Sequence, residues 1–579
     1  MPQTMKMTIL AQDPSVKFPD GTIIRSQVEV PYEALGPGPR GARVHVVDYD
    51  SSQRVLYHPA APPDGTDPFA RASDEALLRD PAFHAQNVYA IVMRLLARFE
   101  AALGRRVAWS FGGHQLHVAP HAFADANAYY SDEARGLFFG YFPIEGGETV
   151  YCCLSHDIVA HEATHAILDG LRESYTLPSH PDQGGFHEGF ADIVALLSVF
   201  ALRDVVRALL PKTKGREGWV PKKALDADKL RKTALLGLAE QFGQETSRHR
   251  ADFLRQAVTR IPRREALQER AFEECHLRGE ILSAAVLSAF VEIWAARLQS
   301  WLPELDQDVP CSRVVEDGAD AAGHLLTMCI RALDYCPAVD LTFPDFLSAL
   351  LTADRELIPD GGKYRYRSVL RKEWAHWGIA PASGTPEEVR AGAVSERGLW
   401  KGIDPSMPLS YDSIHRESLE ASGDEVFRFL WQNRRPLGLF EDAYTWVISV
   451  RPCIRVAPDG FVLRETVSEY RQRIELDAGR LSSTCGGIVK PPKMPDATGV
   501  CLNGGGVLVF DEFGHLKYHI HSRIDDPSRQ NARLEYLWRN GIHDTKGRYG
   551  FSDGVPRGQR FALMHRRRDG LRDRTEEWV

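Results

Sequence analysis

The chain has 579 residues, of which 44% are hydrophobic and 26% charged, with a formal net charge of −8. This composition excludes wholesale disorder, and the length favours several domains or one large enzyme core. The acidic balance argues against a nucleic-acid-binding protein, and no apolar run approaches the roughly 20 residues of a membrane span. We therefore expect neither a nucleic-acid partner nor a membrane partner.

The cysteines and the N-terminus indicate the compartment. The nine cysteines include no C-x-x-C pair, which excludes a zinc ribbon and a thioredoxin-type site. The first residues lack the basic start, the long apolar centre and the small-residue cleavage site of a secretory signal. A chain of this length needs no disulfide framework, so we expect reduced thiols and a cytoplasmic location.

The spacing of apolar residues predicts the secondary structure, with strands first, then mainly helices, then strands again. In chain order, we expect strands at 28–30 and 44–47, a helix over 73–103, strands at 107–111 and 136–142, helices at about 156–171 and 187–201, a mostly helical stretch over 276–378, and a hairpin at 507–518.

Changes in composition along the chain predict four regions. The stretch from 380 to 440 is rich in Gly, Ser, Pro and charge, which is typical of a linker or a lid-like excursion. The predicted regions are a β-rich N-terminal region (1–68), a central region of mixed elements (69–380), a linker or lid-like segment (381–440) and a β-rich C-terminal domain (441–579).

The residues with the clearest chemistry are His161-Glu162-Ala163-Thr164-His165, an H-E-x-x-H motif. On a helix, positions i and i+4 lie on one face, so both imidazoles can bind one metal ion with Glu162 beside them. The motif occurs by chance in roughly one chain of this size in twenty. An acid at the start of the helix and apolar flanking residues favour a buried site over two solvated histidines on a surface helix.

A third ligand is expected from the next helix. Gly184 and Gly185 are predicted to break the chain, after which His187-Glu188-Gly189-Phe190-Ala191-Asp192 begins an apolar helix. Glu188 completes a His-His-Glu set that leaves a fourth position for water, as in catalytic zinc sites. Asp192, one turn further, can accept the free ring N–H of a ligating histidine. The sequence therefore predicts a Zn²⁺ site made by His161, His165 and Glu188.

This stretch resembles the catalytic core of the thermolysin-like zinc metallopeptidases, which belong to the gluzincins. The D-[VI]-V-A sequence before the family's zinc helix is matched by residues 157–160, and the family's aspartate four residues after the second histidine is matched by Asp169. The family's N-E-x-x-x-D motif is matched by 187–192, with His187 in place of the usual Asn. The resemblance covers about 80–380, so it implies that 69–380 is the catalytic domain.

Further site residues follow from the resemblance alone. Asn127, Ala128 and Tyr129 match the start of the family's N-A-[FY]-[WY] edge-strand segment, which binds substrate backbone. His276 matches the histidine that stabilises the transition state, although the glycine that follows is shifted by one position. Tyr175 is an approximate match to the tyrosine after the zinc helix. The family's aspartate partner of this histidine is absent, and Glu273 or Glu274 could substitute.

We therefore expect an α+β fold, with a thermolysin-like catalytic unit in which the zinc cleft lies between a mixed sheet and a helical lobe. The expected activity is endopeptidase cleavage of a peptide or protein substrate, with Glu162 as general base and His276 and Tyr175 holding the oxyanion. Two alternatives are a zinc-containing binding or scaffold protein and an aminopeptidase-type gluzincin. The aminopeptidases carry W-F-G and G-x-M-E-N motifs, which this chain lacks.

Two other features complete the expectations. The C-terminal domain is expected to restrict entry to the zinc cleft, to bind a protein partner, or only to stabilise the fold. Cys152 and Cys153, just before the zinc helix, are predicted to be buried small hydrophobic side chains and not ligands.

Overall fold

The computed structural model describes most of the chain. The described residues are 3–18, 20–61, 66–144, 148–213, 215–231, 262–302, 308–358, 365–382, 398–456, 460, 462–544 and 546–550. Residues 383–397 of the predicted linker and residues 551–579 of the predicted C-terminal domain lie outside them.

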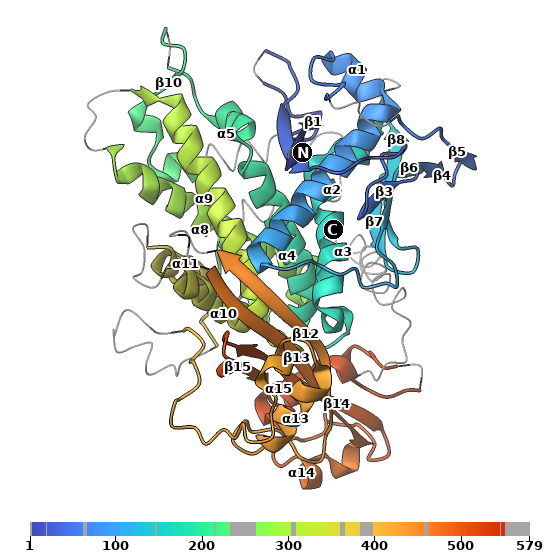
Figure 1. The fold of residues 1–579 in the computed structure, drawn as a ribbon, viewed down its shortest axis with the longest axis vertical. Helices are drawn as coiled ribbons and strands as arrows, with labels where there is room; N and C mark the ends of the chain where they lie inside the picture. The colour runs from blue at the N-terminus through green and yellow to red at the C-terminus, as the bar shows by residue number, and fades with distance from the viewer. Residues whose placement is uncertain are drawn as a thin grey trace.

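The chain has a mixed α+β fold, as expected from the sequence (Figure 1). The N-terminal half contains a five-stranded mixed sheet in which β3, β6 and β8 are parallel, while β7 and β9 pair antiparallel with β8. Its strands are β3 (Val44–Val46), β6 (Leu116–Phe123), β7 (Ala128–Ser131), β8 (Gly136–Pro143) and β9 (Thr149–Tyr151). The short strands β1 (Thr4–Leu10) and β2 (Arg25–Pro31) form a separate pair.

Helices make up most of the centre of the chain. The longer ones are α2 (Pro81–Leu103), α3 (His156–Leu171), α4 (Pro181–Phe200), α8 (Cys275–Gln299), α9 (Cys311–Ala332), α10 (Phe343–Leu357) and α11 (Tyr366–His376). By length and composition α8 could cross a membrane, but 83% of its most apolar 18-residue window is buried inside the structure, as in a core helix.

Three local expectations are wrong. The predicted helix over 73–103 is two helices, α1 (Asp74–Arg79) and α2, because Asp80 leaves the helical conformation and its side chain caps Ala82 N–H at 2.9 Å. Residues 107–111 form no strand, because this segment packs against α3 and does not pair with a neighbouring strand. Ala108 O lies so close to the backbone of α3 that a Cβ added to Gly170 would be 1.9 Å from it. Gly184 and Gly185 lie inside α4, which begins at Pro181.

The C-terminal part contains a four-stranded antiparallel meander, as the strand-like pattern predicted (Figure 1). Its strands are β12 (Tyr444–Val456), β13 (Val462–Asp477), β14 (Gly499–Phe510) and β15 (Leu516–Ser522), accompanied by α13 (Gly423–Gln432) and α15 (Pro527–Arg539). The predicted hairpin at 507–518 is the β14–β15 connection.

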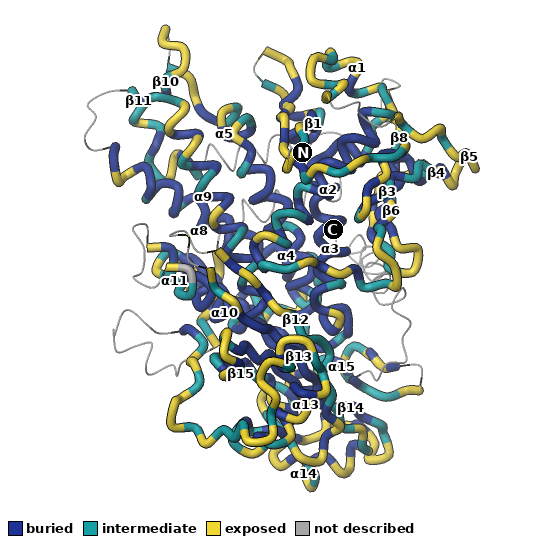
Figure 2. Tube along the Cα trace, viewed as in Figure 1, coloured by how far each residue is buried: buried dark blue, intermediate teal, exposed yellow. Residues whose placement is uncertain are grey.

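One hydrophobic core extends from the N-terminal strands into this C-terminal sheet. The same cluster contains Met7, the interior of α2, α3, α4 and α8, and the side chains of Val467, Val507 and Ile520. Figure 2 shows buried backbone running from α2 and α4 into β13 and β14. The predicted boundary at 440/441 therefore does not coincide with a break in the core.

Buried ion pairs also join the C-terminal sheet to the helices. Asp334, which is 0% exposed, accepts from Arg105 Nη2 at 2.6 Å and from Arg455 of β12. Arg455 also pairs with Glu465 of β13 at 2.5 Å. Burial opposes ionisation of Asp334, but the two arginines hold the pKa of this carboxyl below its usual range. Removal of Asp334 would leave Arg105 buried without its counter-charge.

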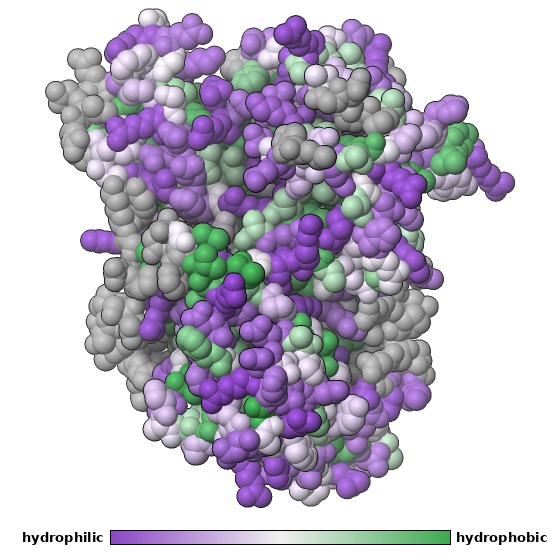
Figure 3. Space-filling model, viewed as in Figure 1, coloured by the Kyte–Doolittle hydropathy of each residue, from purple (hydrophilic) through white to green (hydrophobic). Residues whose placement is uncertain are grey.

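The surface in Figure 3 is mainly hydrophilic, with an apolar patch over the end of β12. Around the β12–β13 connection, Ile454, Val456 and Val462 are exposed.

Candidate metal centre

The H-E-x-x-H residues lie in α3, as predicted, and the third predicted ligand comes from α4. Ser155 precedes the helix, Asp157 lies in its first turn, and apolar residues hold the helix in the core. His161, His165 and Glu188 are 8%, 0% and 2% exposed. Their donor atoms lie within 4.8 Å of one another, so the structure brings the three predicted ligands together.

The separations of the donor atoms fit a single ion. His161 Nε2 lies 2.9 Å from His165 Nε2, and these atoms lie 3.6 and 3.7 Å from Glu188 Oε2. A tetrahedral zinc ion with bonds of about 2.0–2.1 Å would separate its ligand atoms by about 3.3 Å. Shifts of about half an ångström at most would therefore admit the ion, and the two nitrogens and one oxygen suit zinc.

The outer nitrogen of each ligand ring has a defined partner. His161 Nδ1 donates to Asp192 Oδ1 at 2.8 Å, the contact predicted for Asp192. A carboxylate only accepts, so the neutral His161 ring directs its Nε2 lone pair toward His165. His165 Nδ1 lies 2.8 Å from His187 Nδ1. The sequence does not predict this contact, although the position of His187 next to Glu188 places it beside the ligands.

Glu162 is held by the edge strand of the sheet. The side chain is 0% exposed, and Tyr130 N–H of β7 donates to Glu162 Oε2 at 3.0 Å. The Tyr130 hydroxyl donates to Asp169 Oδ2 at 3.0 Å, so Asp169 helps to fix the same strand against α3. The carboxylate that can act as a base is thus oriented by a backbone donor.

The predicted substrate strand presents backbone groups toward this glutamate. Because hydrogen-bonding direction alternates along an antiparallel pair, the backbone groups of Ala128 point to the same side of β7 as Tyr130 N–H. The Ala128 N–H is taken by Asn127 Oδ1 at 2.9 Å, whereas Asn127 O faces β8 and accepts from Gly140 N at 2.8 Å. Tyr129 is 39% exposed and stacks on Phe123 and Phe138. The edge of β7 therefore lies beside the candidate metal centre.

His276 lies at the start of α8 and reaches the same group. Its Nε2 is 3.5 Å from Glu188 Oε2, and its Nδ1 is 2.6 Å from Glu274 Oε1. Glu274 is therefore the partner of His276, while Glu273 pairs with Arg539. Burial alone would lower the pKa of His276, but Cys275, Glu188 and Glu274 together raise it well above its ordinary value. Protonated His276 is suited to donate to a developing negative charge.

Tyr175 does not fit its expected role. Its hydroxyl donates to the carbonyl oxygen of Pro337 at 2.7 Å, and the residue is 1% exposed with its ring against Phe186. The short helix at Glu173–Thr176 turns this side chain into the core. A hydroxyl already bonded in the core is not placed to hold an oxyanion, so we remove Tyr175 from the candidate site.

Neither a protein-family model nor a curated protein matches the chain.

Proposed function

We propose that this protein is a zinc-dependent endopeptidase with a thermolysin-like catalytic unit, in which the five-stranded sheet and the helices from α3 onward form the two sides of the cleft. The observation that carries the proposal is the position of Glu162: it lies in the same helix as two of the candidate ligands and is oriented by the edge strand β7. A purely structural metal site needs no carboxylate in this position. This placement favours an enzyme over the alternative of a binding or scaffold protein.

In the proposed mechanism an extended peptide lies along the outer edge of β7, which brings its carbonyl group toward α3. Zinc held by His161, His165 and Glu188 would polarise that carbonyl and lower the pKa of a water molecule. Glu162 accepts the proton from this water and later delivers it to the leaving amine. His276, oriented by the contact of its Nδ1 with Glu274, donates a hydrogen bond to the oxyanion as charge develops.

Proteolysis of an unfolded protein tests the proposal. We expect cleavage that stops when a chelator removes zinc and returns when zinc is restored. Glu162→Gln should keep the metal and lose turnover, whereas Glu133→Gln, an exposed glutamate of the turn after β7, should cleave at the wild-type rate. Wild-type turnover by Glu162→Gln would refute the assignment. Chelator-insensitive cleavage would refute a metal-dependent mechanism.

The aminopeptidase alternative differs in the substrate end that it recognises. An aminopeptidase requires a free α-amino group, whereas binding along an edge strand requires only an extended backbone. We therefore propose internal cleavage. Blocking the N-terminus of a peptide substrate by acetylation distinguishes the two: cleavage continues for an endopeptidase and stops for an aminopeptidase.

The cell compartment and the role of the C-terminal part are also proposals. We propose a cytoplasmic enzyme whose C-terminal sheet chiefly stabilises the catalytic unit, since β12 and β13 share its core and its buried ion pairs.

A further inference from the structure

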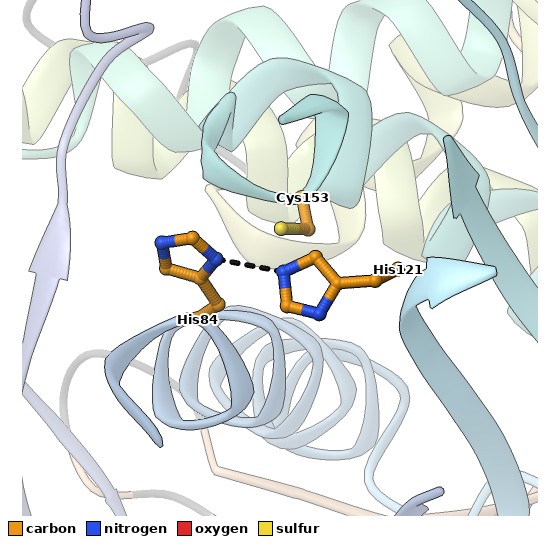
Figure 4. Close-up of side chains that lie close together, drawn as sticks. All are labelled: His84, His121 and Cys153. Atoms are coloured by element: carbon orange, nitrogen blue, oxygen red, sulfur yellow. Dashed lines mark hydrogen bonds between the residues drawn. The ribbon is translucent and has the colours of Figure 1, made fainter. Parts of the chain in front are cut away.

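A second group of metal-binding side chains lies outside the candidate catalytic centre. It consists of His84 from α2, His121 from β6 and Cys153 from the short helix at Cys152–Leu154, which lies immediately before α3 (Figure 4). One donor atom from each side chain lies within 4.8 Å of the other two. The three residues are 1%, 6% and 0% exposed, so the group is enclosed by protein.

The hydrogen bonds around the two rings leave an unusual pair of atoms face to face. His84 Nε2 lies 3.0 Å from Leu78 O, and His121 Nδ1 lies 2.7 Å from Asp48 Oδ2. A carbonyl oxygen and a carboxylate only accept, so these two ring nitrogens carry the protons. The other nitrogens, His84 Nδ1 and His121 Nε2, then direct lone pairs at each other across 2.8 Å.

Two facing lone pairs at this distance repel each other unless a cation lies between them. A metal ion satisfies both nitrogens at once, and the sulfur of Cys153 lies beside them (Figure 4). The outer contacts also follow the usual pattern of metal-binding histidines, which donate their other N–H to a carboxylate or a backbone carbonyl.

We propose that His84, His121 and Cys153 form a second, structural metal site that binds a zinc ion. Imidazole and thiolate ligands suit zinc, and the fourth position that three protein ligands leave is closed to substrate here because the side chains are enclosed by protein. On binding, the Cys153 thiol loses its proton to solvent, so one thiolate and two neutral imidazoles hold the dication. The two ring nitrogens must separate by about half an ångström, because ligand atoms of a tetrahedral zinc ion lie about 3.3 Å apart.

The site would fix the start of the helix that carries the H-E-x-x-H residues. Cys153 lies three residues before His156, where α3 begins, and its carbonyl oxygen already accepts from Asn87 Nδ2 of α2 at 2.9 Å. An ion on His84 and His121 would tie this turn to both α2 and β6. Its proposed role is to position α3, while the enclosure of the site excludes substrate.

Metal content of the purified full-length protein tests the proposal. We expect two equivalents of zinc per chain by elemental analysis, one lost in His84→Gln and the other lost in His161→Ala. A single equivalent that is lost entirely in His161→Ala and retained in His84→Gln would overturn the second site. Retention of one equivalent by His161→Ala, with its loss in the double variant, would support it even if no peptidase activity is found.

Cobalt substitution gives a readout that separates the two centres. Thiolate bound to Co²⁺ produces a sulfur-to-metal charge-transfer absorption, which a His-His-Glu site has no sulfur to produce. We expect this band in the His161→Ala protein and in the Cys275→Ser and Cys152→Ser controls, and its loss in Cys153→Ser. Cys275 is the matched control because it lies beside Glu188 and His276. Absence of the band from cobalt-loaded wild-type protein, or its loss only in Cys275→Ser, would overturn the proposal.

Discussion

Gly189 of α4 and Gly279 of α8 bring the two helices into backbone contact: a Cβ added to Gly189 would lie 2.6 Å from Gly279 O, and one added to Gly279 would lie 2.7 Å from Gly189 N. Glu188 precedes the first glycine, and His276 lies one turn before the second. This crossing therefore sets the 3.5 Å separation between Glu188 Oε2 and His276 Nε2.

Gly279→Ala should separate the helices and weaken the metal centre. The added methyl group meets backbone and cannot be accommodated by a side-chain rotation, so we expect a loss of about 1–3 kcal/mol in the free energy of unfolding and weaker zinc binding. Gly184→Ala is the matched control in α4, since its Cβ would meet only Cys275 Cβ at 3.4 Å. Urea unfolding and zinc titration measure both effects. Equal zinc affinity in the two variants would contradict this account of the crossing.

Substitution of a zinc ligand should lower zinc affinity more than substitution of a residue that hydrogen-bonds to a ligand ring. His165→Ala or Glu188→Ala should lose most of the zinc at the catalytic centre, because each removes a donor atom. Asp192→Asn retains the three donors but weakens the orientation of His161, so we expect about a 10–100-fold loss in zinc affinity. Equilibrium zinc titration distinguishes the two classes. Full zinc affinity in Glu188→Ala would assign the third ligand to another residue.

His276→Ala should lower kcat by a factor on the order of 100 with little change in zinc content, because it removes a donor to the oxyanion. Glu274→Gln should cause a smaller fall in kcat at unchanged KM, since Glu274 acts through His276, which it contacts at 2.6 Å. Glu273→Gln is the control. Loss of zinc in His276→Ala would instead place His276 among the metal ligands.

Acid should destabilise the protein through buried neutral histidines. Burial and nearby arginines lower the pKa of His156 and of His521 to about 3 from an ordinary value of 6.5. The unfolded chain takes up these protons first, so the stabilisation is complete above pH 6.5 and is lost as the pH falls toward 3. Between pH 7 and 5, protonation of each of these histidines in the unfolded chain should lower the free energy of unfolding by about 2 kcal/mol. In His156→Gln, the fall in free energy of unfolding over this range should be smaller by that amount; an unchanged fall would contradict the assignment.

Asp334→Ala should be strongly destabilising, because Arg105 would remain buried without its counter-charge and Arg455 would keep only Glu465. We expect a loss of about 3–5 kcal/mol in the free energy of unfolding. Glu316→Ala removes an exposed pair with Arg203, in which both side chains are more than half exposed, and should change stability by less than about 1 kcal/mol.

A chain truncated before Tyr444 should be insoluble, because β12 and β13 share the hydrophobic core and the buried ion pairs of the helices. A soluble, active truncated enzyme would show that the C-terminal sheet is dispensable for folding and favour a regulatory role.

Local patterns in the sequence were sufficient for the helix that carries His161 and His165 and for the β14–β15 hairpin. Helical periodicity and i, i+4 spacing act over a few residues, so no tertiary information is needed to place two imidazoles on one face. The pairing of Glu188 with that face was also predictable, because the next helix offered a carboxylate in a recognisable arrangement.

Only the tertiary structure decided the remaining contacts between distant groups. His187 and Glu274 became ring partners of site histidines, Tyr175 turned into the core, and His84, His121 and Cys153 converged from three elements, because such contacts depend on packing between segments far apart in the chain. Gly184 and Gly185 were predicted to break the chain, and they lie inside α4 for the same reason. Glycine is unfavourable in an isolated helix, but at Gly185, where a Cβ would lie 2.9 Å from the side chain of Arg278, it lets α4 lie against α8.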